Sequence, residues 1–383
     1  MNTKVLGGAV LLMLLFVFGF AAYQFVGKNS AQGAAAAASE PPIRIGLIAP
    51  ITGPFPDWGE SIRNGVMLAT EDTHHKIDVA FQDDACDPKQ TLSVAKKFAS
   101  VDGIHIIFAG CDDGIKAALP FTKQHDVLVL SASLLGDAVF KENPTGLINL
   151  ATQISTEAGF MAAHLHSQGI KRFAIVYATN VFGTELSERL PEKLEKYGIT
   201  LVANEPTALG LSDFRTTIQK VLASKPDGIF ILQAFEQVGI FAKQVRDVNK
   251  TIPLYDIYTA ESKTVVEAGG RAVNGMQYTF PVNDADGREK KANFERRYKE
   301  KFGVDPSPTS YFMYDGIQLL DKALDVCAST DALCVEKFLK NYGPYEGIGG
   351  RMEIQKDGSN IRPFGIKEIR DGQFVWVTKE VKL

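Results

Sequence analysis

Short apolar segments alternate with segments of helical periodicity along almost the whole chain, and this alternation limits the possible folds more than any other feature. Because the apolar segments are nearly continuous, they are predicted to be strands buried on both faces. Strands of this kind, separated by helices, are typical of a parallel sheet covered on both sides. In the first series the predicted strands are 43–49, 77–82, 104–109, 127–131 and 148–150, and the predicted helices are 59–70, 88–99 and 115–125.

A second series of the same kind begins near residue 156. Its predicted helices are 156–168, 183–197, 214–223 and 238–248, and its predicted strands are 173–177, 200–204, 228–233 and 254–257. Helices at 292–302 and 311–327 and a hairpin-like tail at 351–354, 364–370 and 373–377 follow. Two series predict two doubly wound lobes. In such sheets ligands bind at the carboxyl ends of the strands, which are the loops 49–59, 110–114, 131–136, 177–183 and 233–239.

The length and charge of the chain agree with two domains and exclude one class of partner. About 340 of the 383 residues follow the N-terminal segment, and single cores usually divide above about 250–300 residues. The net charge is −4 and no long basic run occurs. Nucleic acid is therefore not an expected partner.

The N-terminal segment predicts export. A short basic start is followed by a nearly uninterrupted apolar run at residues 5–26 and by an alanine-rich tract. The run is long for a signal peptide and close to the length that spans a bilayer, so a cleaved signal and an uncleaved inner-membrane anchor both remain open. In either case the positive-inside rule places Lys4 in the cytoplasm and the rest of the protein in the periplasm.

The cysteines fit an exported chain. Four are present, and an even number in an oxidising compartment indicates disulfides. The spacing does not match a zinc site, which usually contains a closely spaced cysteine pair or convergent histidines. Three pairings are possible, and the local one is the simplest: Cys86 with Cys111 and Cys327 with Cys334.

The sequence lacks the residue patterns of common enzymes. Nucleophile-elbow, zinc-protease and phosphate-loop motifs are absent. His164 and His166 are two residues apart on a predicted helix, so they point to different faces and make a poor metal pair. No cofactor and no metal is expected, and the protein is predicted to bind a ligand without catalysing a reaction.

One motif and several shorter segments match a known pattern. The motif is DDACDPKQ at 83–90, with Cys111 following the third predicted strand. The shorter segments are IAPITGP at 48–54, Trp58-Gly59 and VFG at 181–183. Together they resemble the type I periplasmic binding proteins of the branched-chain amino acid importer group, over residues 43–380.

The resemblance implies an α/β fold of two doubly wound lobes joined by a three-strand hinge. The chain is expected to cross between the lobes near residues 152–155, 279–283 and 345–350. The expected division is an N-terminal segment at 1–42, lobe 1 at 43–153 and 281–346, and lobe 2 at 154–280 and 347–383.

The resemblance also implies a site, and here the sequence departs from the family. Members hold the carboxylate of an amino acid with hydroxyl and backbone N–H groups of two loops. The first loop carries Asp112 and Asp113 where serines are usual. The second loop reads Ser131, Ala132, Ser133 and Leu134, with Leu134 at the usual threonine position. A carboxylate at a helix N-terminus repels an anionic ligand, so an ordinary amino acid is not the expected ligand. An N-terminal helix cap is the alternative role for either aspartate.

Five further residues complete the predicted site, and four of them are aromatic. Trp58, Phe182 and Phe235 lie in loops at strand ends, and Phe182 stands where the family commonly has a tyrosine. A wall without these hydroxyl groups favours an aromatic, aliphatic or weakly polar ligand, while core packing is the alternative role for both phenylalanines. Tyr258 and Glu261 compete for the position of the ammonium-binding acid of the family.

The predicted function is capture of a small organic ligand, such as an amino acid-like compound, an amide or an aromatic or aliphatic compound, in an interlobe cleft. Hinge closure around the ligand would present it to an ABC permease in the inner membrane. A membrane-anchored sensor with a signalling partner is the alternative, because the same fold serves as the ligand-binding half of receptors.

Overall fold

A computed structural model describes residues 41–282, 288–379 and 381. The chain divides into two units, Met1–Pro42 and Ile43–Leu383, of which the second is compact. The predicted signal or anchor at 5–26, together with Lys4, lies outside the described residues. Within the described part, no helix is long and apolar enough to cross a membrane. The fold described below is that of the second unit.

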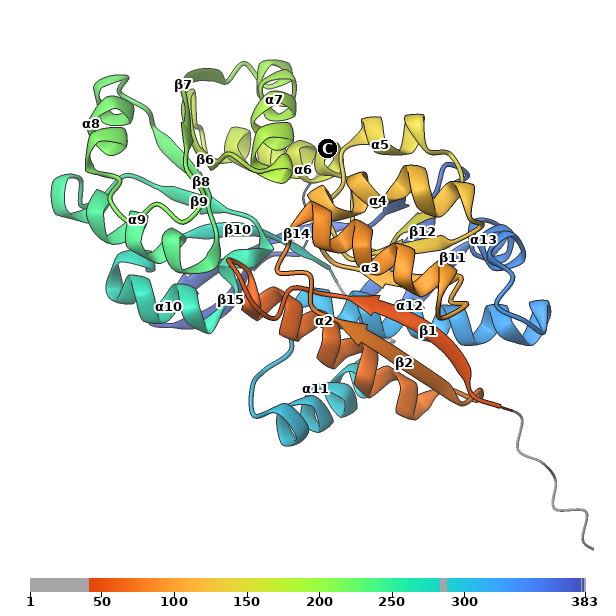
Figure 1. The fold of residues 1–383 in the computed structure, drawn as a ribbon. Coiled ribbons are helices and arrows are strands. Elements are labelled where there is room, and N and C mark those ends of the chain that lie inside the picture. The colour runs from red at the N-terminus through yellow and green to blue at the C-terminus, as the bar shows by residue number, and fades with distance from the viewer. Residues whose placement is uncertain (1–40, 283–287, 380, 382–383) are drawn as a thin grey trace, which may run out of the picture. The chain divides into compact units, whose positions relative to one another are not determined.

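The first lobe is built on a five-stranded sheet in the order β2-β1-β3-β4-β5, in which every pair of neighbours is parallel. Figure 1 shows two of these strands, β1 and β2, side by side. All five strands of the first predicted series are confirmed within about two residues. They are β1 (Ile43–Ile48), β2 (Ile77–Gln82), β3 (Ile106–Ala109), β4 (Leu128–Ser131) and β5 (Leu147–Asn149).

Helices cover both faces of this sheet because alternate residues of its strands are apolar on both sides. Ile107 and Ala109 of β3 belong to the core beneath α3 and α4, whereas Phe108 faces the opposite side and lies against Gly316 of α12. The helices of this lobe are α2 (Pro56–Ala69), α3 (Pro88–Ser100), α4 (Asp112–Gln124), α5 (Asp137–Glu142), α12 (Pro308–Cys327) and α13 (Ala332–Asn341), with the short helix η1 (Thr70–Asp72). Helices α5 and α13 were not predicted from the sequence.

The second lobe is built on a seven-stranded sheet in the order β15-β14-β10-β9-β8-β6-β7. Five strands are parallel, and the C-terminal hairpin of β14 and β15 joins the edge in antiparallel orientation. The strands are β6 (Arg172–Ala178), β7 (Thr200–Thr207), β8 (Gly228–Leu232), β9 (Leu254–Asp256), β10 (Gln277–Pro281), β14 (Phe364–Arg370) and β15 (Gln373–Thr378).

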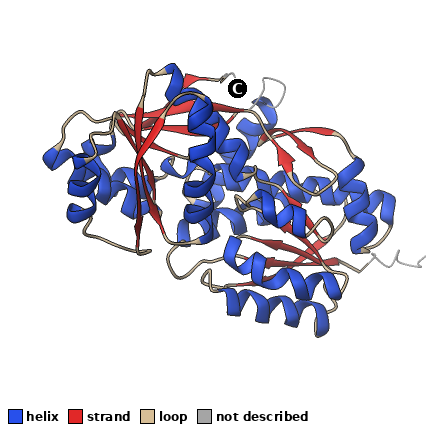
Figure 2. Cartoon of the chain, turned by 90° about the horizontal axis from the view of Figure 1, so that it is seen from above, coloured by secondary structure: helices blue, strands red, loops and turns tan. Residues whose placement is uncertain are grey.

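Helices again lie on both faces of the second sheet (Figure 2). They are α6 (Ile154–Ser167), α7 (Val181–Lys196), α8 (Arg215–Ala223), α9 (Phe235–Val248) and α10 (Lys263–Gly269), with the short helices η2 (Tyr258–Ala260) and η3 (Gly270–Val273). Strand β10 and helix α10 were not predicted from the sequence. The predicted architecture of two doubly wound lobes is confirmed.

A small antiparallel sheet changes the expected course of the last crossing between the lobes. It consists of β11 (Pro344–Gly347), β12 (Gly350–Ile354) and β13 (Asn360–Ile361). Its turn contacts the first lobe, since the backbone N–H of Asn149 donates to the carbonyl of Gly358 at 2.8 Å. The chain therefore enters the seven-stranded sheet only at β14, later than the expected crossing at 345–350.

Arg362 lies at this last crossing and is 1% exposed. Its guanidinium donates from Nε to the carbonyl of Leu150 at 3.0 Å and from Nη1 to the carbonyl of Gly349 at 2.8 Å. It also lies 4.3 Å from the ring centroid of Phe312. Because Leu150 precedes the first crossing, one buried side chain ties two of the crossing segments together.

Both disulfides have the local pairing. Cys86–Cys111 joins the loop after β2 to the residue before α4. Asp87 caps α3 by accepting the backbone N–H groups of Lys89 and Gln90, both at 2.9 Å. The motif at 83–90 therefore fixes the start of one helix and, through the disulfide, the position of the next.

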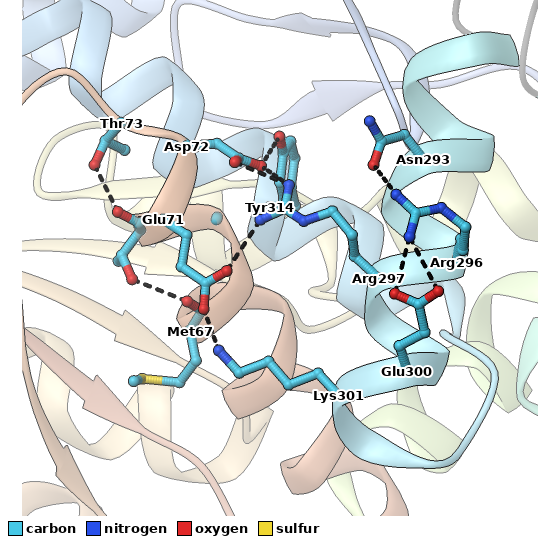
Figure 3. Close-up of polar contacts among 12 residues, drawn as sticks. Met67, Glu71, Asp72, Thr73, Asn293, Arg296, Arg297, Glu300, Lys301 and Tyr314 are labelled. Atoms are coloured by element: carbon cyan, nitrogen blue, oxygen red, sulfur yellow. Dashed lines mark hydrogen bonds and ion pairs between the residues drawn. The ribbon is translucent and has the colours of Figure 1, made fainter.

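Helix α11 (Arg288–Phe302) is held to the first lobe by a network of ion pairs (Figure 3). Arg297 donates to both carboxylate oxygens of Asp72, at 2.9 and 2.7 Å, and to Glu71 at 3.0 Å. The hydroxyl of Tyr314 donates to Asp72 at 2.8 Å, and Lys301 pairs with Glu71. The hydrogen bond from Lys301 lowers the pKa of Glu71.

We expect Arg297→Gln to lower the free energy of unfolding by about 1–2 kcal/mol, because bidentate pairing within a network exceeds the usual value of a surface ion pair. Arg296→Gln is the matched control, since Arg296 is exposed and pairs within its own helix, with Glu300. Its loss should cost less than about 0.5 kcal/mol. Urea denaturation measures both, and equal effects of the two substitutions would contradict the assigned role.

Candidate ligand-binding site

The carboxyl ends of the parallel strands in the two lobes meet in direct contacts. Lys116 of α4 pairs with Glu185 of α7 at 3.0 Å, and Asp57 of α2 accepts the hydroxyl of Thr264, at the start of α10. A Cβ atom on Gly136, in the loop after β4, would lie 1.6 Å from Glu185 Oε2, so the carboxylate of Glu185 approaches this backbone closely. These contacts bring together the strand-end loops that were predicted to hold the ligand.

Asp112 lies at the centre of this interface. It is the first residue of α4 and 6% exposed, and its carboxyl group accepts the backbone N–H groups of Asp113 and of Phe182 in the other lobe. Its second oxygen, Oδ2, has no hydrogen-bond partner. Burial, together with the charge of Asp113, raises the pKa of Asp112 to about 7.

The expected capping role of the aspartates is wrong. Cys111 is the N-cap residue of α4, and no side chain caps this helix. Asp112 and Asp113 instead occupy the first turn, where a negative charge interacts favourably with the helix dipole. Asp113 is partly buried.

The loop after β4 is wholly buried and internally bonded. Ser131, Ala132 and Ser133 are each 0% exposed. The Ser131 hydroxyl accepts the backbone N–H of Ser133 at 3.0 Å, and the Ser133 hydroxyl donates to the carbonyl of Gly110. Both hydroxyl groups therefore already have partners within the first lobe, and Leu134 beside them is 3% exposed.

The three predicted aromatic residues lie in the first turns of helices that follow parallel strands. Trp58 is in α2, Phe182 in α7 and Phe235 in α9. Each is partly buried and packs against the main core. The indole Nε1 of Trp58 is buried and has no hydrogen-bond partner, although its ring lies edge-on to Phe55.

Tyr258 and Glu261 contact different lobes. Tyr258 is 3% exposed, bonds the side chain of Thr309 and lies edge-on to Phe312, both in α12 of the first lobe. Glu261 accepts the hydroxyl of Tyr278 at 2.8 Å and pairs with Lys367. Its charge is therefore already balanced within the second lobe.

Two buried acids were missed by the sequence analysis. Glu157 of α6 is 1% exposed, accepts the hydroxyl of Thr279, and has an unpartnered Oε2. Asp256, at the end of β9, is also 1% exposed, and its Oδ2 is unpartnered. Two sequence features could have identified them. Glu157 is the single acid in an otherwise largely apolar helix, and Asp256 lies at the carboxyl end of a parallel strand. Burial raises the pKa of both groups, that of Glu157 to about 8.

The family model for periplasmic binding proteins matches residues 42–373. The chain belongs to the periplasmic binding protein family. A Leu/Ile/Val-binding protein homologue of Brucella abortus is 24% identical over 344 residues, which cover 86% of this chain and 91% of the relative. An amino acid binding protein of Pseudomonas aeruginosa is 23% identical and is covered to 86% by a match over 82% of this chain.

Solved structures confirm the periplasmic binding protein fold. A leucine binding protein of Thermotoga maritima has a TM-score of 0.80 at 18% identity, covering 88% of this chain and 98% of that protein. A solute binding protein of Rhodopseudomonas palustris in complex with benzoate has a TM-score of 0.79 at 17% identity, covering 88% and 96%. The resemblance to the branched-chain amino acid group is confirmed, and the family consists of solute-binding proteins rather than enzymes.

The raised pKa of Glu157 predicts that stability falls with rising pH. The group ionises near 4.5 when unfolded and near 8 when folded, so between these values the folded state retains a proton that the unfolded chain has released. Glu157→Gln removes this difference. We expect its stability relative to the parent protein to rise by at least about 1 kcal/mol from pH 5 to pH 8.

Urea denaturation at each pH measures this effect. The exposed Glu195 of α7 provides the control, since Glu195→Gln should follow the parent protein at every pH. A constant difference between Glu157→Gln and the parent protein would show that Glu157 is ionised in the folded state.

Proposed function

We propose that this protein captures a small organic ligand between its two lobes and presents it to an ABC permease of the inner membrane. The observation that carries the proposal is the meeting of strand-end loops from both lobes at Asp112, Phe182 and Glu185, in a chain that belongs to a solute-binding family. A ligand that contacts both sets of loops favours the closed arrangement of the lobes.

The proposed ligand-contacting residues are those at the facing strand ends. From the first lobe they are Trp58, Asp112, Asp113, Ser131, Ala132 and Ser133, and from the second lobe they are Phe182, Phe235, Tyr258 and Glu261. The partly buried aromatic side chains favour an aromatic or aliphatic body in the ligand. The relatives support this range, since one is named for leucine, isoleucine and valine and one neighbour holds benzoate.

The proposed hinge consists of the three crossings between the sheets. The chain leaves β5 for α6, leaves β10 for α11, and passes from β13 to β14. With this course, lobe 1 comprises residues 43–153 and 288–361, and lobe 2 comprises the remainder of the described chain from residue 154 onward. Arg362 fixes the relative position of two crossings and leaves their neighbouring backbone as the site of bending.

The alternative function is that of a membrane-anchored sensor, and residues 5–26 are the feature that favours it. The two functions differ in the fate of this segment. Release of the protein into the periplasm with the segment removed favours import, whereas retention in the inner-membrane fraction favours sensing or a localised receptor. N-terminal sequencing after fractionation of cells distinguishes them.

Ligand capture predicts a fluorescence response confined to one of the two tryptophans. The compact unit, Ile43–Leu383, is screened with disulfides intact against amino acids, amides, aromatic acids, amines and short fatty acids. A ligand that binds only the folded state raises the free energy of unfolding, by about 2.7 kcal/mol at a free concentration of 100 times Kd, and therefore raises the melting temperature. The hit should alter the emission of Trp376→Phe, in which Trp58 remains, and leave that of Trp58→Phe unchanged.

A response from Trp376 alone would place the ligand away from the facing strand ends. If no compound of the panel binds to the well-folded protein, this result would count against capture of such compounds. It would favour the anchored interaction protein.

A further inference from the structure

Among the buried polar atoms that lack partners at the lobe interface, which include Oε2 of Glu185, two have opposite hydrogen-bonding character. Oδ2 of Asp112 is without a donor, and Nε1 of Trp58 is without an acceptor. Leaving a buried polar group unpaired costs about 1–3 kcal/mol, so such groups usually meet a partner in the functional state. The pair therefore requires a ligand with both an N–H or O–H donor and an acceptor.

Both atoms lie where a bound ligand would contact the two lobes. Trp58 and Asp112 belong to the first turns of α2 and α4, which follow the neighbouring strands β1 and β3. Asp57, next to Trp58, contacts Thr264 of the second lobe, and Asp112 accepts the backbone N–H of Phe182 there. The two first turns therefore face the second lobe side by side.

The charges at this interface disfavour a free carboxylate in the ligand. Asp113 lies beside Asp112 in the same turn, and both carry acidic groups. The cations of the surrounding segments are already engaged. Lys116 is paired with Glu185, Lys367 with Glu261, and Arg362 with two backbone carbonyls. An anionic ligand group would meet like charge without a free cation from any of these three.

Resting on the proposed function, we propose that the ligand is a carboxamide with an apolar body and no free carboxylate. The amide N–H group donates to Asp112 Oδ2, and the amide oxygen accepts from Trp58 Nε1. An apolar body fits the partly buried rings of Phe182 and Phe235. The loop after β4 adds no competing hydroxyl, because the hydroxyl groups of Ser131 and Ser133 are bonded within the first lobe.

The test compares acid and amide pairs with the same body by isothermal titration at pH 7.5. Benzoate with benzamide, isovalerate with isovaleramide, and leucine with leucinamide are the probes, on the compact unit Ile43–Leu383. In at least one pair the amide should bind about tenfold or more tightly than its acid, which corresponds to about 1.4 kcal/mol. Tighter binding of the acid in every pair that binds would overturn the proposal.

Substitutions of Asp112 and Trp58 test whether these two side chains cause the preference for the amide over the acid. Asp112→Asn removes the charge and keeps the shape, so the amide-to-acid preference should fall about tenfold. Glu188→Gln removes an exposed charge from α7 and should leave the preference unchanged. Trp58→Phe removes the donor and keeps a ring, so amide affinity should fall by about threefold to tenfold. An unchanged preference in Asp112→Asn would contradict the role of this carboxyl group.

The outcomes separate this inference from the proposed function. Binding of a compound without an amide group, with the response of Trp58, would support capture and overturn the carboxamide assignment. Binding of nothing in the wider panel, by a folded protein, would count against both.

Discussion

A parallel strand pair can be connected only by a crossover that returns the chain to the same edge of the sheet, and in each lobe helices make these crossovers. The carboxyl ends of all such strands therefore lie along one edge, and the first turns of the following helices gather there. In this protein that edge carries Trp58 and Asp112 in one lobe and Phe182 and Phe235 in the other. These residues are far apart in the sequence, but each lies just after a parallel strand. They therefore all lie at the interface.

The interface contains polar groups that are paired between the lobes and buried polar atoms that have no hydrogen-bond partner. Lys116–Glu185 and the backbone N–H of Phe182 bonded to Asp112 join the two lobes without a ligand. Oδ2 of Asp112 and Nε1 of Trp58 remain unpaired at the same interface. The same interface therefore contains direct contacts between the lobes and buried polar atoms whose hydrogen-bonding capacity is not used by the protein's own groups.

Much of the fold could be predicted because it depends on local apolar patterns. The strands of both series and most of the helices were predicted within a few residues, and the local disulfide pairing was the simplest of three. Helices α5, α10 and α13 and strands β10, β11 and β13 were not predicted, and β12 was expected in the C-terminal tail rather than in a separate small sheet. Residues 345–350, where the resemblance implied the last crossing, instead lie in β11, β12 and the tight turn between them, and the chain joins the seven-stranded sheet at β14.

The sequence by itself determined the two-lobed architecture, the strand-end loops and the identity of the residues in them, because burial of continuous apolar strands leaves few arrangements. Only the tertiary structure decided how these residues are paired. It placed Glu261 beside Lys367 and Tyr278, bonded Ser131 and Ser133 within their own lobe, and brought Glu157 and Asp256 into the interior. Pairing of charges and hydrogen bonds depends on contacts between distant segments, and local sequence patterns carry no record of those contacts.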